Sequence, residues 1–195
     1  MDTSTYKTVR YSRTTLTELM IPSYANFGGK VHGGILLALM DKLAYVCAAK
    51  HAGNYCVTAS IHNVDFLAAV EVGDLVSLKA SVNYVGRSSL IVGIRIEAEN
   101  VKTQSRRHTN TSYFTMVAMD ESHKPVEVPG LVLESAEEVR RFHDAMVRHA
   151  MKRENRGKPG NAEGKIAGAD EQSIAPLLST ERCVIKIRTA QCAED

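Results

Sequence analysis

The sequence contains no tryptophan, and its seven tyrosines and four phenylalanines all lie at or before Phe142. The last 53 residues therefore contain no aromatic side chain, and glycine is frequent between residues 157 and 168. A segment of this composition buries too little apolar surface to offset the entropy cost of ordering the chain. We predict two parts within the 195 residues: a compact domain over 1–156 and a low-complexity, flexible C-terminal tail over 157–195.

Other scarce features each exclude a class of protein. No apolar run approaches the roughly 18 residues of a membrane-spanning helix, and the N-terminus lacks the pattern of a signal peptide. With 24 Lys and Arg against 22 Asp and Glu, the chain lacks the basic excess typical of nucleic-acid binding. No G-x-S-x-G motif of a serine-elbow hydrolase occurs, and neither the four cysteines nor the seven histidines are spaced as metal ligands. We expect a cytoplasmic protein with no membrane span, no nucleic-acid partner and no bound metal.

Hydrophobic patterning predicts one long helix followed by four strands. Residues 35–51 are apolar on nearly every side and Gly53 follows them, which is typical of a buried helix with a glycine stop. Apolar residues then recur at every second position, as in strands with one buried face. The predicted strands cover 57–62, 76–84, 90–98 and 109–119.

Two further elements complete the predicted order. Scattered apolar residues over 7–22 favour a first strand, and Ser135 with Glu138 forms a capping box that opens a last helix. A helix that is apolar on all sides has to be covered, and an antiparallel sheet curled around it does so economically, which makes the class α+β. Five strands still leave one flank of the helix and one sheet edge uncovered. We therefore expect a second copy of the chain to pair there.

A few polar residues near the helix could carry chemistry. Asp41, the one carboxylate inside it, lies two turns from Gly34 on the same face and could be a general base or nucleophile. It could equally be a helix acid paired with Lys42. Gly33 and Gly34 could form an oxyanion hole from free backbone N–H groups, or could serve close packing only. Asn26 could orient a water or a carbonyl, or make a local turn bond.

The segment from Ala25 to Gly34, A-N-F-G-G-K-V-H-G-G, followed by Asp41, resembles the signature of the hot-dog-fold acyl-CoA thioesterases. This family includes bacterial acyl-CoA thioester hydrolases and the cytosolic brain-type acyl-CoA hydrolase. Shorter matches follow in the same order at 55–60, 72–74, 84–89 and 111–118. The resemblance implies an antiparallel sheet wrapped around a long central helix, to which the sequence adds the C-terminal helix and a tail without a family counterpart.

The resemblance also implies an activity, the hydrolysis of acyl-CoA thioesters to fatty acid and coenzyme A. Asp41 matches the catalytic aspartate, base or nucleophile, and Asn26 matches the catalytic asparagine, which reaches the site from the partner subunit of a hot-dog dimer. The helix entry that receives the thioester carbonyl is matched by His32, Gly33 and Gly34. A turn near the nucleotide of coenzyme A is matched by Gly86, Arg87 and Ser88.

Assembly and regulation are implied in the same way. Members typically form trimers of dimers, need no cofactor beyond the coenzyme A of the substrate, and in some cases bind a regulatory nucleotide. Lys30 departs from the family pattern, because relatives often carry Asn or Asp there. An alternative function on the same fold is a non-hydrolytic acyl-CoA or nucleotide sensor.

Overall fold

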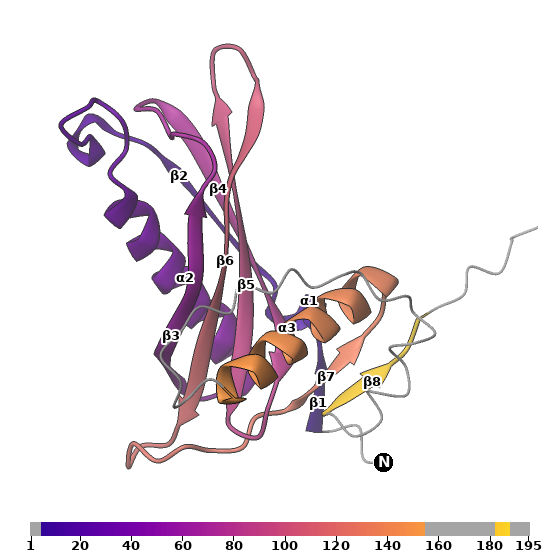
Figure 1. Cartoon of the computed structure of the whole chain (residues 1–195). Helices are drawn as coiled ribbons and strands as arrows, with labels where there is room; N and C mark the ends of the chain where they lie inside the picture. The colour runs from indigo at the N-terminus through magenta and orange to yellow at the C-terminus, as the bar shows by residue number, and fades with distance from the viewer. Residues whose placement is uncertain (1–4, 155–181, 188–195) are drawn as a thin grey trace, which may run out of the picture.

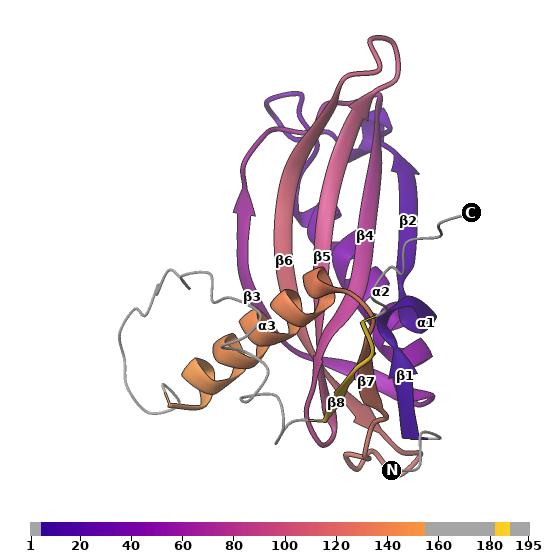
Figure 2. The ribbon, with the colours of Figure 1, turned by 90° about the vertical axis from the view of Figure 1, so that its right-hand side faces the viewer.

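The computed structural model of the chain describes residues 5–154 and 182–187, and within them five strands form an antiparallel sheet in the order β2-β4-β5-β6-β3. Helix α2 (Gly33–Ala52) lies along one face of this sheet (Figure 1). Helix α3 (Ala136–Glu154) crosses the opposite face near one end (Figure 2). The α+β class and the sheet around a central helix are confirmed. The strands are β2 (Thr14–Leu19), β3 (Tyr55–Phe66), β4 (Asp74–Val85), β5 (Ser89–Asn100) and β6 (Arg106–Met119).

Helix α2 begins and ends where local chemistry directs it. The His32 side chain caps its N-terminus, because Nδ1 accepts the Gly34 N–H at 3.0 Å. At the other end, Gly53 takes the left-handed conformation with φ of 74°, and its N–H donates to the Ala49 carbonyl at 2.8 Å. The predicted glycine stop is confirmed. In the described part of the chain no helix is long and apolar enough to span a membrane.

One flank of α2 and one edge of the sheet remain uncovered, as the sequence predicts. The inner side of the helix is buried against the sheet, whereas Tyr45 and Val46 on its outer side are 40% and 41% exposed. Strand β3 pairs with β6 on one side only and forms the sheet edge beside this flank. Its Tyr55 and Phe66 are 52% and 53% exposed. The single chain therefore covers α2 on one side only, and the exposed flank is the one where we expect a second copy of the chain to pack.

The predicted first strand over 7–22 is wrong in its extent. The chain forms β1 (Tyr6–Thr8), the one-turn helix α1 (Val9–Ser12) and only then β2, with a 3-10 turn η2 (Pro22–Tyr24) after it. The Thr8 hydroxyl accepts the Tyr11 N–H at 3.2 Å, which caps a helical turn in the middle of the predicted strand. Val9 and Ser12 are buried within that turn.

A small parallel sheet lies beside the main one, in the order β1-β7-β8. Strand β7 (Gly130–Leu133) is buried at every position and was not predicted; its signal is a run of three apolar residues after Gly130. Strand β8 (Cys183–Ile185) belongs to the predicted tail and pairs with β7. The predicted boundary at residue 156, and most of the tail, lie outside the described residues.

The Ser135 cap of the last helix is confirmed, and the return bond of the predicted box reaches one residue further back. The Ser135 hydroxyl accepts the Glu138 N–H at 3.3 Å, and Glu138 Oε2 in return accepts the N–H of Glu134 at 2.8 Å. Val139 and Phe142 of α3 are buried against the sheet. This helix therefore covers the sheet face that α2 does not.

Candidate active site

Asp41 lies near the middle of α2 and faces β3. The Thr58 hydroxyl on β3 donates to Asp41 Oδ1 at 2.7 Å, and it also lies 3.5 Å from the sulfur of Met116. The single hydroxyl proton favours the shorter, charge-assisted bond to the carboxylate. Asp41 is thus oriented by Thr58, and among the described residues no ion pair joins it to Lys42.

Sequence reasoning gave Thr58 no role, although the signal was present. Asp41 lies twelve residues before Gly53, about 18 Å along a helix. Thr58 lies five residues after Gly53, about 17 Å along a strand. Two elements that turn back at Gly53 therefore place these two side chains at the same level.

The Asp41–Thr58 pair opens into a groove between α2 and β3. The rings of Tyr45 and Tyr55 contact each other there, with centroids 5.9 Å apart. Cys56 also lines the groove, but burial raises the pKa of its thiol to about 11, so it stays protonated and is a poor nucleophile. The full lining is Asp41, Lys42, Tyr45, Val46, Tyr55, Cys56, Val57 and Thr58. Apolar side chains beside one oriented carboxylate suit an apolar ligand that carries a reactive polar group.

Asn26 lies in the turn that precedes α2. Its Oδ1 accepts the N–H groups of Gly28 at 2.9 Å and Lys30 at 3.1 Å, so the local turn bond considered from the sequence is present. Because Oδ1 accepts from the turn, the other terminal atom of the amide is Nδ2, and it points away from the turn. No described residue accepts from Nδ2, and the side chain is exposed. The amide is therefore a fixed hydrogen-bond donor, and it does not line the groove with Asp41.

The helix entry offers fewer free donors than the sequence suggests. The His32 N–H donates to the Tyr24 carbonyl at 2.8 Å, and the Gly34 N–H donates to His32 Nδ1. Only Gly33, of these three, has an N–H without an acceptor among the described residues. A Cβ at Gly33 would lie 3.1 Å from the Phe66 ring, and one at Gly34 would lie 3.1 Å from His32 Nδ1. Both contacts are tighter than usual, so a side chain at either position would displace the Phe66 ring or the His32 cap, and Gly33 remains the candidate oxyanion donor.

The turn of Gly86, Arg87 and Ser88 joins β4 to β5. Its backbone is held by three hydrogen bonds: Gly86 N–H to the Ser89 carbonyl, and N–H groups of Val128 and Ala118 to the carbonyls of Arg87 and Ser88, all between 2.8 and 2.9 Å. The Arg87 side chain is exposed. A hydrogen bond from Arg182 and the nearby charge of Arg87 lower the pKa of the Glu127 carboxyl, which places this arginine beside the β7–β8 region.

The predicted site residues lie far apart within one chain. Gly33 and Asp41 are separated by eight residues, about 12 Å along the helix. The 86–88 turn follows the twelve residues of β4, about 40 Å from the end of the sheet that adjoins the helix entry (Figure 1). A single chain thus brings Asp41 to Thr58, but brings neither Asn26 nor Gly33 to Asp41.

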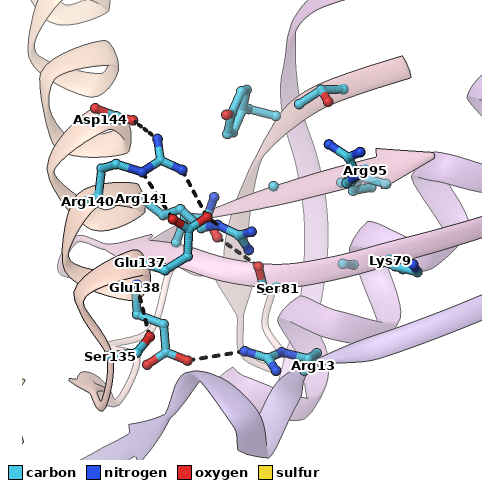
Figure 3. A pocket seen from close by; sticks show the side chains of 16 residues that line it. Arg13, Lys79, Ser81, Arg95, Ser135, Glu137, Glu138, Arg140, Arg141 and Asp144 are labelled. Carbon is cyan, nitrogen blue, oxygen red and sulfur yellow. Dashed lines mark hydrogen bonds and ion pairs between the residues drawn. The ribbon is translucent and has the colours of Figure 1, made fainter. Parts of the chain in front are cut away.

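A second cavity lies on the opposite face, between α3 and the sheet (Figure 3). Its basic side chains are each paired with a carboxylate, and hydrogen bonds from Arg95 and Lys79 lower the pKa of Glu97 to about 2. The other pairs are Arg13 with Glu138, Arg140 with Glu137 and Asp144, and Arg141 with Glu137. Because these charges neutralise one another locally, the groove at Asp41 is the stronger candidate. The described part of the chain contains no group of three or more His, Cys, Asp or Glu placed to hold a metal.

Comparison with known proteins identifies the family. The family model described as the thioesterase superfamily matches residues 28–104. Protein VdlD of Helicobacter pylori is 39% identical over 160 residues, which cover 82% of this chain and 91% of VdlD. The acyl-CoA thioester hydrolase YkhA of Bacillus subtilis, described as uncharacterized, is 34% identical over 171 residues, 88% of this chain and 99% of YkhA.

Solved structures give the same result. A hexameric acyl-CoA thioesterase in its apo form has a TM-score of 0.76 and 39% identity, over 80% of this chain and 99% of that one. The acyl-CoA hydrolase of Staphylococcus aureus, solved with butyryl coenzyme A and coenzyme A, has a TM-score of 0.74 and 31% identity, over 88% and 98%. Three variants of the latter replace an asparagine, an aspartate and a threonine by alanine. These positions are spaced by 15 and 17 residues, as are Asn26, Asp41 and Thr58.

A long helix on an antiparallel sheet, with an acid turned toward the first strand after the helix, defines a hot-dog-fold protein. The chain belongs to the thioesterase superfamily, within the group of acyl-CoA thioester hydrolases.

Proposed function

We propose that this chain hydrolyses acyl-CoA thioesters to the free fatty acid and coenzyme A. Each site would combine Asp41 and Thr58 of one subunit with Asn26 and the Gly33 N–H of the partner subunit. The observation that carries the proposal is the 2.7 Å bond by which Thr58 orients Asp41 in an open, largely apolar groove. The identical spacing of the three residues replaced in the Staphylococcus aureus hydrolase supports the same assignment.

The need for a partner follows from distance and exposure. Gly33 is about 12 Å from Asp41 along the helix, too far for both to contact one carbonyl. Asn26 and Gly33 both lie at the N-terminal end of α2. A second subunit packed antiparallel on α2 and β3 would therefore supply both to the site at Asp41. The exposed side chains of that face would then be buried: Tyr45, Val46, Tyr55, Ile61 and Phe66. Three such dimers would make the hexamer described for related thioesterases.

The chemistry requires no cofactor. Asp41 takes a proton from a water whose oxygen attacks the thioester carbonyl carbon, or attacks that carbon itself and is later released by water. The carbonyl oxygen gains negative charge, which the Gly33 N–H and the Asn26 amide of the partner subunit stabilise by hydrogen bonds, each worth about 3 kcal/mol when well placed. The C–S bond then breaks, and the coenzyme A thiolate leaves and takes up a proton.

Three further proposals concern coenzyme A binding, regulation and location. Arg87 on the 86–88 turn is an exposed cation that can pair with a phosphate of coenzyme A. A regulatory nucleotide and a cytoplasmic location stay predictions from the family resemblance and the sequence. Calorimetry with free nucleotides and fractionation of cells test them directly.

Thiol release from a panel of acyl-CoAs of different chain length tests the activity. We expect Asp41→Asn or Asn26→Ala to lower kcat at least about a hundredfold while light scattering shows an unchanged oligomer. Turnover that survives both substitutions would refute the proposal. Tight acyl-CoA binding without turnover by the unaltered protein would instead identify a sensor.

Mixing the two variants tests the shared site. In a hybrid dimer of Asp41→Asn and Asn26→Ala subunits, one site carries both defects and the other carries neither. Co-expression should therefore restore activity that neither variant has alone. If both residues came from the same subunit, every site in the hybrid would stay defective.

A further inference from the structure

Lys30, the residue that departs from the family pattern, closes the turn that carries Asn26. Its N–H donates to Asn26 Oδ1 at 3.1 Å, and its carbonyl accepts the Asn26 N–H at 2.6 Å. Asn26 is thus bonded to Lys30 through both its backbone and its side chain. Any shift of Lys30 would turn the Asn26 amide.

Backbone hydrogen bonds also hold the turn: the Ala25 N–H donates to the Pro22 carbonyl and the Gly29 N–H to the Asn26 carbonyl, each at 3.0 Å. Residues 25–30 are all exposed, and Val31 is the first buried residue after them. None of the turn's own side chains therefore packs in the core. Polar contacts to the neighbouring 69–74 segment replace such packing: Val31 N–H donates to the Val70 carbonyl at 2.9 Å, and Lys30 forms a β-bridge with Glu71.

The Lys30 side chain extends this contact. Its Nζ lies 2.6 and 2.7 Å from the two carboxylate oxygens of Glu71. Both side chains are nearly half exposed, so the pair contributes little to global stability. A weak pair can still set the position of an exposed turn relative to the segment beside it.

Glu71 is a firm anchor for this pair. Its N–H donates to Asp74 Oδ2 at 2.9 Å, and Asp74 is buried and paired with Arg107 at 2.5 Å. Arg107 also donates to the Ala69 carbonyl at 3.0 Å. The segment that receives Lys30 is therefore tied to the sheet by an ion pair whose carboxylate, Asp74, is buried.

We propose that Lys30 and Glu71 are positioning residues, which hold the Asn26 amide at the angle that the partner's site requires. This inference rests on the proposed function, because Asn26 must act there for its orientation to matter. The pair touches no substrate and acts only through the turn. An Asn or Asp at position 30 would be too short and of the wrong charge to bind Glu71 in this way.

A kinetic cycle tests the proposal on the intact oligomer. We expect Lys30→Ala to lower kcat about three- to tenfold, because the Asn26 amide would then be held less often at the required angle, with KM changed less than about twofold. Lys30→Arg, and the double exchange Lys30→Glu with Glu71→Lys, should restore most of kcat. Lys30→Ala added to Asn26→Ala should cost nothing further, because the residue acts through Asn26. Lys79→Ala, which removes a comparable exposed pair with Glu97, is the matched control and should leave kcat unchanged.

Hydrogen exchange separates failure of this inference from failure of the proposed function. The N–H groups of Gly28 and Lys30, bonded to Asn26 Oδ1, should exchange faster in Lys30→Ala and remain protected in Lys79→Ala. An unchanged kcat in Lys30→Ala, or losses that add to those of Asn26→Ala, would overturn the positioning role. If the unaltered protein lacks turnover, the proposed function fails. Unchanged hydrogen exchange in Lys30→Ala would separately overturn the inference that Lys30 holds the Asn26 turn in position.

Discussion

The bond from Thr58 to Asp41 allows a sharp test of how the carboxylate is oriented. Thr58→Val keeps the shape of the side chain and removes the hydroxyl that donates at 2.7 Å. A hydrogen bond to a charged group is worth about 1.5–3 kcal/mol, and about 1.4 kcal/mol corresponds to tenfold in rate. Asp41 is only partly buried, so water can replace part of the bond. We therefore expect the lower end of that range, a decrease of about tenfold in kcat.

The assay is steady-state thiol release with one acyl-CoA, combined with thermal unfolding. Valine suits a strand at least as well as threonine, so the melting temperature should not fall while kcat does. Thr58→Ser keeps the donor and should remain within about threefold of the unaltered protein, since only a methyl group is lost. If Thr58→Val retains full kcat, or Thr58→Ser loses as much as Thr58→Val, the hydroxyl does not orient the catalytic carboxylate.

Two further predictions concern stability and the tail. Burial lowers the pKa of His51 from 6.5 to about 4, so the unfolded state binds more protons than the folded state below pH 6.5. The free energy of unfolding, measured in urea, should therefore fall by up to about 3 kcal/mol as the pH decreases from 6.5 to 4. His51→Gln should make the free energy of unfolding less dependent on pH over this range. Deletion of residues 157–195 removes the β7–β8 hydrogen bonds, including Leu131 N–H to the Arg182 carbonyl at 2.9 Å. The melting temperature should fall, whereas kcat/KM should stay within a few-fold; a large loss of activity would show that the tail belongs to the site.

Much of this fold could be predicted because its signals are local. The apolar run of α2 and its Gly53 stop, the alternation in β4 to β6, and the Ser135 capping box each depend on residues a few positions apart. The errors arise where the apolar pattern is overridden by a local cap or is too short to read. Thr8 caps a helical turn inside the predicted first strand, and β7 is too short to show a period.

The sequence by itself therefore determined the class of fold, the family, and the identity of Asn26 and Asp41 as candidates. Only the tertiary structure paired Asp41 with Thr58, occupied the N–H groups of His32 and Gly34, and separated Asn26 from Asp41. The bond between Thr58 and Asp41 joins residues distant in sequence and depends on how elements pack, whereas the bond from Gly34 to His32 depends on a side-chain rotamer; local hydrophobic pattern carries no record of either. The same holds for Lys30, whose role depends on an anchor 41 residues away.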